Sequence, residues 1–220
     1  GAGFIGCNAA KRFMDRGDRV VVVDNLSRKG TDLNLAWLKE QGGFDFIQAD
    51  IRDAGAMREA IGRDRDLDAV LHLAAQVAVT TSVTDPRSDF DINALGTFNV
   101  LEAVRQASSD PIVVYASTNK VYGGMEDVAV VERNGRYAYE DLPGGVPESR
   151  TLDFHSPYGC SKGAADQYVR DYARIYGLKT AVFRQSCIYG YRQLGVEDQG
   201  WVAWFTIAAV LGKPIVLYGD

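Results

Sequence analysis

Histidine and cysteine are scarce in this chain, and their scarcity narrows the chemistry that the protein can support. The 220 residues include two histidines and three cysteines. His72 and His155 belong to no cluster with the spacing of metal ligands, so the sequence predicts no structural or catalytic metal site. Cys7, Cys160 and Cys187 form no disulfide framework and follow no signal peptide, so we expect a reducing, cytoplasmic compartment.

The chain also lacks a long apolar run and an excess of basic residues. No run approaches the length of a bilayer-spanning helix, so no membrane partner is expected. The 24 Lys and Arg residues against 29 Asp and Glu residues give a net charge of −5, which disfavours nucleic acid as a partner. A composition of 46% hydrophobic and 24% charged residues is typical of a globular protein with one full core.

Short apolar runs alternate with segments of helical periodicity along most of the chain. The runs, typical of buried parallel strands, lie at residues 19–24, 44–49, 69–74, 112–116 and 180–183. The predicted helices lie at residues 6–17, 33–41, 54–61 and 86–106, and a further one begins at Tyr158. This alternation predicts an α/β fold, a doubly wound parallel sheet of the Rossmann type with helices on both faces.

Three glycines lie where the first predicted helix begins. Gly1, Gly3 and Gly6 lack side chains that would keep a pyrophosphate away from the backbone, and a helix N-terminus favours the anion. Asp24 ends the next strand, where a carboxylate accepts hydrogen bonds from the adenosine ribose and repels a 2′-phosphate. NAD is therefore the predicted cofactor, although Arg28 tempers the preference over NADP. The alternative is a tight turn followed by a solvated acid.

A tyrosine and a lysine four residues apart open the last long helix. Tyr158 and Lys162 share a helix face, and a neighbouring cation lowers a tyrosine pKa from its usual value of about 10. Tyr158 is then suited to move the proton of a hydroxyl group. Ser117 and Thr118 follow a strand, at the carboxyl edge of the sheet where such folds bind ligands. The alternative for the Tyr and Lys pair is an ordinary exposed helix face.

These motifs together resemble a known superfamily. In chain order they are Gly3-Phe4-Ile5-Gly6, Asp24, Asp50-Ile51, His72-Leu73-Ala74-Ala75, Asn93, Ser117-Thr118, Val121-Tyr122-Gly123, and Tyr158 with Lys162. The set is similar to the extended short-chain dehydrogenase/reductase superfamily, specifically its NAD-dependent nucleotide-sugar epimerase and dehydratase branch, over essentially the whole chain.

The resemblance implies roles for individual residues. Thr118, Tyr158 and Lys162 would be catalytic. The implied cofactor contacts are Gly1, Gly3, Phe4, Ile5, Gly6, Asp24, Asn25, Ser27, Arg28, Asp50, Ile51, Leu73, Ala74, Ala75, Gln76, Asn93, Ala116, Ser117, Tyr158 and Lys162. Two of these have a structural alternative, since Asp50 suits a helix cap and Asn93 a buried helical amide.

The resemblance also bears on the type of reaction. Sugar 4,6-dehydratases of this branch carry Asp-Glu directly after the Ser-Thr pair, whereas this chain has Asn119 and Lys120. An amide and an ammonium are poor substitutes for the acid and base that water elimination needs. We therefore expect oxidation followed by return of the hydride.

Longer stretches narrow the resemblance further. Residues 117–123, 152–168 and 198–202 resemble epimerases of this branch that invert C2 of a CDP-linked deoxyhexose through a 2-keto sugar. The rival within the branch is an epimerase acting at C4 of a UDP-sugar, and the rival from another class is a non-catalytic dinucleotide-binding module. The resemblance also implies a homodimer or higher homo-oligomer, in which the helices at 86–106 and 158–176 pair between subunits.

The substrate contacts follow from the same comparison. They are Val77, Thr80, Ser82, Thr118, Asn119, Ser186, Arg192, Gln193 and Gln199. Residues 77–82 lie where relatives place a sugar-contacting loop, but turn chemistry before Pro86 explains them equally well. Cys187 stands where the superfamily usually has Asn, which leaves the diphosphate contact open.

Two domains are expected. We assign residues 1–185 to the NAD-binding Rossmann-type domain and residues 186–220 to the start of a substrate-binding region. A strand normally precedes the glycine loop of such a sheet, and a strand predicted at 214–220 has nothing after it to pair with. We therefore expect a fragment that lacks the first strand and most of a small C-terminal domain. Residues 123–157 are the longest irregular region, and such loops are usually functional.

Overall fold

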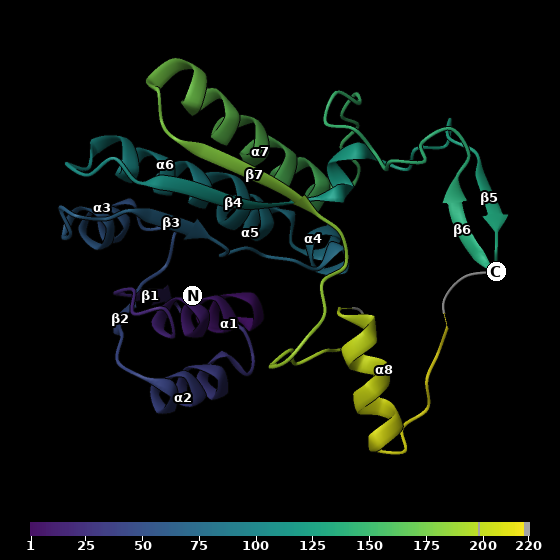
Figure 1. Cartoon of the computed structure of the whole chain (residues 1–220), viewed down its shortest axis with the longest axis horizontal. Helices are drawn as coiled ribbons and strands as arrows, with labels where there is room; N and C mark the ends of the chain where they lie inside the picture. The colour runs from purple at the N-terminus through teal and green to yellow at the C-terminus, as the bar shows by residue number, and fades with distance from the viewer. Residues whose placement is uncertain (198, 218–220) are drawn as a thin grey trace.

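A computed structural model gives the structure of residues 1–197 and 199–217. Its strands are β1 (Val21–Asp24), β2 (Asp45–Gln48), β3 (Ala69–His72), β4 (Ile112–Thr118), β5 (Val130–Arg133), β6 (Arg136–Tyr139) and β7 (Thr180–Gln185). β1 pairs with β2, and β3, β4 and β7 form a second sheet in the order β3-β4-β7, with every pair parallel (Figure 1). The predicted α/β fold of the Rossmann type is confirmed.

Helices connect and cover these strands. They are α1 (Phe4–Met14), α2 (Thr31–Gln41), α3 (Ala54–Gly62), α4 (Val79–Thr84), α5 (Pro86–Phe90), α6 (Gly96–Gln106), α7 (Ser156–Tyr176) and α8 (Trp201–Val210). A π-helical turn, η1 (Asp91–Leu95), joins α5 to α6, and a 3₁₀ turn, η2 (Asn119–Tyr122), follows β4. The helix predicted over 86–106 is therefore present, with a π turn inside it. Within the described residues, no helix combines the length and apolar character needed to cross a membrane.

The parallel strands of the Rossmann-type fold lie in two groups. Among the described residues, no strand pairing joins the β1-β2 sheet to the β3-β4-β7 sheet. In Figure 1 the two lie one beside the other, with β1, β2, α1 and α2 grouped apart from β3, β4 and β7.

Three apolar clusters hold the helices against the strands. Met57, Ile61, Val100, Val104 and Val113 join α3, α6 and β4. A second cluster contains Leu101, Tyr115, Ala165, Val169 and Tyr172 and packs α7 on the opposite side of α6 and on β4. The third contains Ala10, Val22 and Leu38, from α1, β1 and α2. Because α7 packs on β4, its first turn lies at the carboxyl end of that strand.

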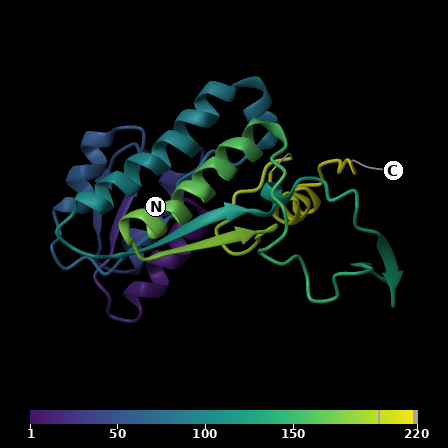
Figure 2. The same ribbon diagram turned by 90° about the horizontal axis from the view of Figure 1, so that it is seen from above.

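Three local expectations were wrong. The irregular region 123–157 contains the antiparallel hairpin β5-β6, which projects from the body of the molecule (Figures 1 and 2). Its turn is Asn134-Gly135, with φ of 56° and 71°, a sequence that favours two-residue hairpin turns because both residues tolerate positive φ. Residues 79–84 form α4 rather than a plain loop. Residues 214–217 are irregular rather than a strand, and residues 218–220 lie outside the described part of the chain.

Candidate active site

The glycine loop is shaped partly by packing and partly by open space. A Cβ on Gly1 would lie 2.3 Å from the carbonyl oxygen of Val23, and one on Gly6 would lie 1.9 Å from that of Gly1. Gly1 therefore lets the loop pass close to β1, and Gly6 lets α1 pass close to Gly1. A Cβ on Gly3, by contrast, would meet no atom within 4 Å. Gly3 precedes α1 and has no side-chain cap, so the free N–H groups of this helix face an open cleft, as a pyrophosphate requires.

Asp24 connects the loop to the end of β1. Its Oδ2 accepts a hydrogen bond of 2.8 Å from the backbone N–H of Ala2, and its Oδ1 accepts one of 2.8 Å from that of Leu26. The carboxylate also lines the cleft. It therefore orders the backbone on both sides of the predicted ribose position while presenting a negative charge there.

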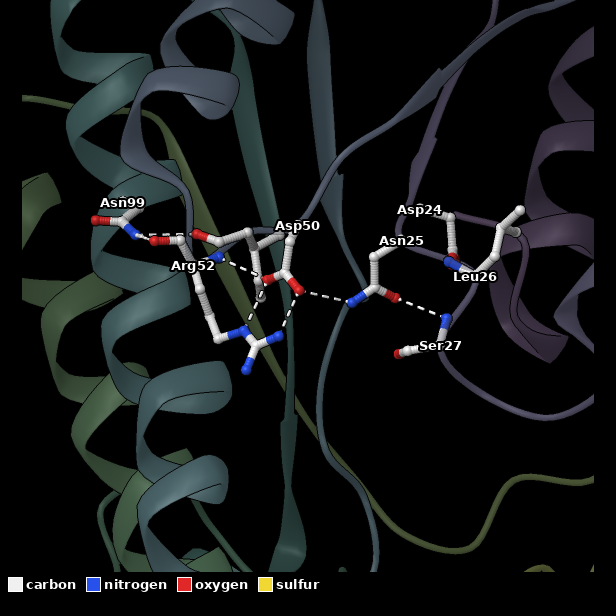
Figure 3. Close-up of polar contacts among 8 residues, drawn as sticks. Asp24, Asn25, Leu26, Ser27, Asp50, Arg52 and Asn99 are labelled. Atoms are coloured by element: carbon white, nitrogen blue, oxygen red, sulfur yellow. Dashed lines mark hydrogen bonds and ion pairs between the residues drawn. The ribbon is translucent and has the colours of Figure 1, made fainter.

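Asp50 belongs to a polar network beside the same cleft (Figure 3). Arg52 donates two side-chain hydrogen bonds to its carboxylate, of 3.0 and 2.7 Å, and Asn25 donates a third of 2.8 Å. The guanidinium holds the pKa of Asp50 well below its usual range. Asn99 of α6 donates to the carbonyl oxygens of Ile51 and Arg52, each at 3.0 Å. The network fixes the loops after β1 and β2, which bound the predicted adenine position.

One cleft of about 590 Å³ joins the glycine loop to the predicted catalytic residues. This volume is within the range of small-molecule sites, about 300–1,000 Å³. The predicted residues that line it are Gly1, Gly3, Phe4, Ile5, Gly6, Asp24, Asn25, Ser27, Arg28, Asp50, Ile51, Leu73, Ala74, Ala75, Val77, Thr80, Ala116, Ser117, Thr118, Asn119, Tyr158, Lys162, Ser186, Arg192, Gln193 and Gln199. The structure thus brings most of the predicted contacts together, and the residues present fit a dinucleotide.

Tyr158 lies in the first turn of α7, between the cleft and the end of β4. It is 8% exposed, and burial, its largest influence, raises the pKa of the phenol above 10. The hydroxyl of Thr118 acts in the opposite direction, because a hydrogen bond to the phenolate lowers this pKa. Thr118 is therefore placed to assist ionisation of Tyr158.

Lys162 does not lower the pKa of Tyr158 in this structure, contrary to the expectation from their spacing. Its Nζ instead donates a hydrogen bond of 2.6 Å to the carbonyl oxygen of Ala116 and lies 4.3 Å over the ring of Tyr115. Burial lowers the pKa of Lys162 to about 7, although Asp166 and Asp89 act to raise it. For both side chains, burial has a larger effect on the pKa than the neighbouring group one helical turn away.

Three predicted site residues lie outside the cleft. Gln76 and Asn93 bond to each other, since the Oδ1 of Asn93 accepts from the N–H of Gln76 at 2.9 Å and its Nδ2 donates to the carbonyl oxygen at 3.1 Å. Asn93 is 1% exposed, which favours the structural alternative of a buried helical amide. Ser82 is fully buried in α4 and donates to the carbonyl oxygen of Val79 at 2.7 Å. None of the three lines the cleft.

Arg192 lies nearer the predicted adenosine position than its assignment as a substrate contact implied. Its guanidinium lies 4.9 Å over the ring of Trp37 and donates to the carbonyl oxygen of Leu33 at 3.2 Å, both in α2. The Nδ2 of Asn8 in α1 donates to the carbonyl oxygen of Tyr191 at 2.8 Å. The segment after β7 therefore passes over α1 and α2 at the glycine-loop end of the cleft.

Sequence reasoning also missed cleft residues. They include Lys29, Gly30, Thr31, Asn34, Ile92, Lys120, Gln185, Ile188, Tyr189, Leu194, Glu197 and Trp201. Gly30 carried a usable signal in the sequence, because glycine is the residue that most readily adopts positive φ. In the structure its φ is 87°, and a Cβ there would meet Leu194 at 2.0 Å. Asp198, which begins the third resembling stretch, lies outside the described residues. In the part of the chain that the structure describes, no three His, Cys, Asp or Glu residues are grouped to hold a metal ion.

Comparison with known proteins finds relatives that are nucleotide-sugar epimerases. The model of the NAD dependent epimerase/dehydratase family matches residues 1–220. CDP-paratose 2-epimerase of Salmonella typhi is 50% identical over 225 residues, a match that covers 100% of this chain and 66% of that enzyme. The chain thus spans slightly less than two thirds of that relative.

Two solved structures share the fold. The UDP-glucose 4-epimerase of Thermotoga maritima with UDP-glucose is 31% identical, with a TM-score of 0.80 over 100% of this chain and 64% of its own. The UDP-glucose 4-epimerase of Thermus thermophilus in complex with NAD is 32% identical, with a TM-score of 0.78 over 99% of this chain and 63% of its own. The resemblance seen in the sequence motifs is confirmed. The chain belongs to the NAD dependent epimerase/dehydratase family, within the extended short-chain dehydrogenase/reductase superfamily.

Proposed function

We propose that the protein containing this chain is an NAD-dependent nucleotide-sugar epimerase that inverts C2 of a CDP-linked deoxyhexose, converting CDP-paratose to CDP-tyvelose. The observation that carries the proposal is a continuous cleft that joins the glycine loop to Thr118, Tyr158 and Lys162. The choice of sugar and carbon is supported by the 50% identity to CDP-paratose 2-epimerase. Such a reaction belongs with polysaccharide biosynthesis.

The chain's own residues supply binding and proton transfer. Bound NAD would accept a hydride from the sugar carbon and return it to the other face, so no external oxidant is consumed. Tyr158 takes the proton of the sugar hydroxyl as the hydride leaves and gives it back when the hydride returns. Thr118 holds the oxygen from which the proton departs. Lys162 would hydrogen-bond the nicotinamide ribose.

The residues after Thr118 support epimerisation over elimination. Asn119 accepts a hydrogen bond of 3.4 Å from the hydroxyl of Thr118, and Lys120 is an exposed residue that also lines the cleft. Neither side chain is a carboxylic acid, which a dehydratase would need at this position to protonate the departing hydroxyl. The sugar therefore keeps all of its oxygen atoms.

The proposal extends to domains, compartment and assembly. Residues 1–185 would bind NAD and residues 186–220 would begin the substrate-binding region. The protein would be cytoplasmic. The exposed apolar residues on η1, α6 and α7, which suit a homodimer interface, are Leu95, Phe98, Tyr168, Ile175 and Tyr176. α6 and α7 run side by side (Figures 1 and 2), so two copies could form a four-helix interface.

The test uses full-length protein loaded with NAD. CDP-linked and UDP-linked hexoses, deuterated at C2, are incubated in ordinary water, with unlabelled sugars in deuterated water run in parallel. The products are followed by proton NMR. We expect a CDP-sugar inverted at C2 that retains its own deuterium and gains none from solvent.

Three outcomes would redirect the proposal. Inversion of a UDP-sugar at C4 would favour the rival suggested by the UDP-glucose 4-epimerases. Tight NAD binding without reduction by any sugar would favour a non-catalytic binding module. Solvent deuterium at C2 would contradict hydride transfer altogether.

A further inference from the structure

Asp89 of α5 is a fully buried carboxylate that takes part in no ion pair among the described residues. Its Oδ2 accepts a hydrogen bond of 2.5 Å from the hydroxyl of Ser161, and its Oδ1 accepts bonds of 2.8 Å from the Nε2 of Gln76 and 3.1 Å from the Nδ2 of Asn93. Burial of an ionised carboxylate is costly unless it is hydrogen-bonded or paired. Three hydrogen bonds offset the cost of burying Asp89, and its charge is then free to act on nearby titratable groups.

The neighbouring cation is Lys162. Ser161 is the residue before it on α7, and the Asp89 charge acts to raise the pKa of Lys162 against the effect of burial. Asp166, one turn further along the helix, has the same sign, but Arg184 of β7 pairs with it through two hydrogen bonds of 2.9 and 3.0 Å. Asp166 has the larger effect on the pKa of Lys162, but its charge is shared with Arg184, whereas Asp89 is in no ion pair among the described residues.

The other groups around Lys162 bring no charge. His72 of β3 is buried, and desolvation lowers its pKa to about 3, so the ring is neutral. The phenol of Tyr115 on β4 is neutral because burial raises its pKa above 10. The phenol of Tyr158, on α7 itself, is subject to the Asp89 charge as well, which raises its pKa. Asp89 thus acts on both members of the Tyr158 and Lys162 pair.

The same hydrogen bonds hold the catalytic helix in place. The hydroxyl of Ser161 lies 3.2 Å from the carbonyl oxygen of Tyr158, so Asp89 is connected to the backbone of the first turn of α7 through one side chain. Through Gln76 and Asn93 it is connected to the loop after β3, whose residues 73–75 line the cleft. One carboxylate therefore joins the catalytic helix to the loop that borders the cofactor position.

We propose that Asp89 is a positioning residue of this active site, which fixes the start of α7 through Ser161 and whose buried charge favours the protonated form of Lys162. The proposal rests on the proposed function, since a charged Lys162 matters to catalysis only if Tyr158 and Lys162 perform the hydride-linked proton transfer. Asp89 itself touches neither substrate nor cofactor.

The substitution Asp89→Asn tests the charge and keeps the shape. The oxygen of the introduced amide can accept from Gln76 and Asn93, while its NH₂ donates to the Ser161 hydroxyl, which is then free to donate to the carbonyl oxygen of Tyr158. We expect a folded protein in which the pKa values of Lys162 and Tyr158 both fall. Both limbs of the pH profile of kcat/KM should therefore move to lower pH by about one unit.

A direct readout does not depend on the substrate. Trace acetylation of the full-length, NAD-free protein with acetic anhydride at a series of pH values, followed by peptide mass spectrometry, gives the midpoint at which Lys162 becomes nucleophilic. We expect this midpoint to be about one unit lower in Asp89→Asn. Asp171→Asn is the matched control, because it removes the same charge from the exposed end of α7, where Asp171 pairs with Arg174. Its midpoint should equal that of the wild type.

Ser161→Ala separates position from charge. It removes the link between Asp89 and α7 but leaves the carboxylate, so we expect a lower kcat with both limbs of the pH profile unmoved. An unchanged Lys162 midpoint in Asp89→Asn would overturn the proposal, and if that variant does not fold, a wild-type kcat in Ser161→Ala would do so. Absence of epimerisation by the wild type would instead overturn the proposed function, while the acetylation midpoint would still decide the role of Asp89.

Discussion

The ammonium of Lys162 lies 2.6 Å from the carbonyl oxygen of Ala116, so the lysine of α7 is bonded to the end of β4. Ala116 directly precedes Ser117 and Thr118, whose side chains are also at this end of the strand. The bond therefore fixes the distance between the two elements that carry the proposed catalytic groups. The position of Lys162 in the cleft is set by protein contacts alone.

Burial of Lys162 predicts a pH dependence of stability. The ammonium has a pKa of about 7 when folded and about 10.4 in an unfolded chain. Between these values the unfolded chain binds the extra proton, so this group makes the free energy of unfolding increase as pH rises.

We expect Lys162→Met to lose that increase. Between pH 7 and pH 9 the wild type should gain up to about 2 kcal/mol relative to the variant, measured by urea denaturation of the NAD-free proteins at both pH values. Lys179→Met is the control, because that lysine is an exposed partner of Asp110. If the free energy of unfolding changed equally with pH in the wild type and in Lys162→Met, the low pKa of Lys162 would be contradicted.

The phenol of Tyr158 is predicted to be essential for turnover but not for folding. Tyr158→Phe removes one hydroxyl from a mostly buried side chain and leaves Lys162 and the glycine loop unchanged. General acid–base groups contribute about 10²–10⁴-fold to rate, so kcat should fall by that factor while NAD remains bound, as measured by epimerisation kinetics and by the protein-bound nucleotide content. Tyr137→Phe, on the exposed hairpin, is the control. Near wild-type kcat in Tyr158→Phe would assign the base elsewhere.

The glycine loop offers a matched pair of substitutions. A methyl group on Gly3 meets no protein atom within 4 Å, whereas one on Gly6 lies 1.9 Å from the carbonyl oxygen of Gly1. Gly3→Ala should therefore keep or slightly raise the melting temperature, since alanine reduces the entropy of the unfolded chain, and should weaken NAD binding by filling the space beside the helix N-terminus. Gly6→Ala should lower the melting temperature itself.

Thermal unfolding without nucleotide and titration with NAD separate these two effects. A Gly3→Ala protein that binds NAD as the wild type does would show that the open space beside Gly3 is not the pyrophosphate position. A Gly6→Ala protein of unchanged melting temperature would show that Gly1 can move away from α1 at no cost in stability.

The sequence predicted the elements of the fold better than the roles of polar residues inside it. Strands and helices followed from apolar runs and periodicity, which depend on local spacing. The buried contacts of Gln76 and Asn93 with Asp89 and Ser161 were not predicted, because they join the loop after β3, the segment from α5 to η1, and α7, which are separate along the chain. The role of Asp89 was not predicted for the same reason, because it depends on the burial of this carboxylate. The failure to predict β5-β6 was different in kind, since Asn134-Gly135 carried the hairpin signal locally.

The pKa of Tyr158 shows a second limit of sequence reasoning. The four-residue spacing correctly placed Tyr158 and Lys162 in one cleft, but it gave the wrong direction for the phenol. Burial depends on the packing of α7 against β4, and its effect on the pKa exceeds that of a helical neighbour. The sign of such a shift can be read only from the assembled structure.

The final prediction concerns the buried ion pair behind the site. Arg184 donates two hydrogen bonds to Asp166, which is fully buried and also accepts one of 2.7 Å from the hydroxyl of Ser117. Arg184→Met would leave this carboxylate buried without its counter-charge, at a cost of about 3–5 kcal/mol in the free energy of unfolding. Arg174→Met removes an exposed pair with Asp171 and should cost at most about 1 kcal/mol.

Urea denaturation of both variants measures the difference, and the double variant Arg184→Met with Asp166→Asn supplies the decisive comparison. Because the second substitution removes the orphaned charge, it should recover part of the lost stability, even though one more native residue has been replaced. If the double variant were less stable than Arg184→Met alone, the destabilisation would come from lost packing around Arg184, which also lies 5.0 Å over the ring of Tyr122, and not from the buried carboxylate.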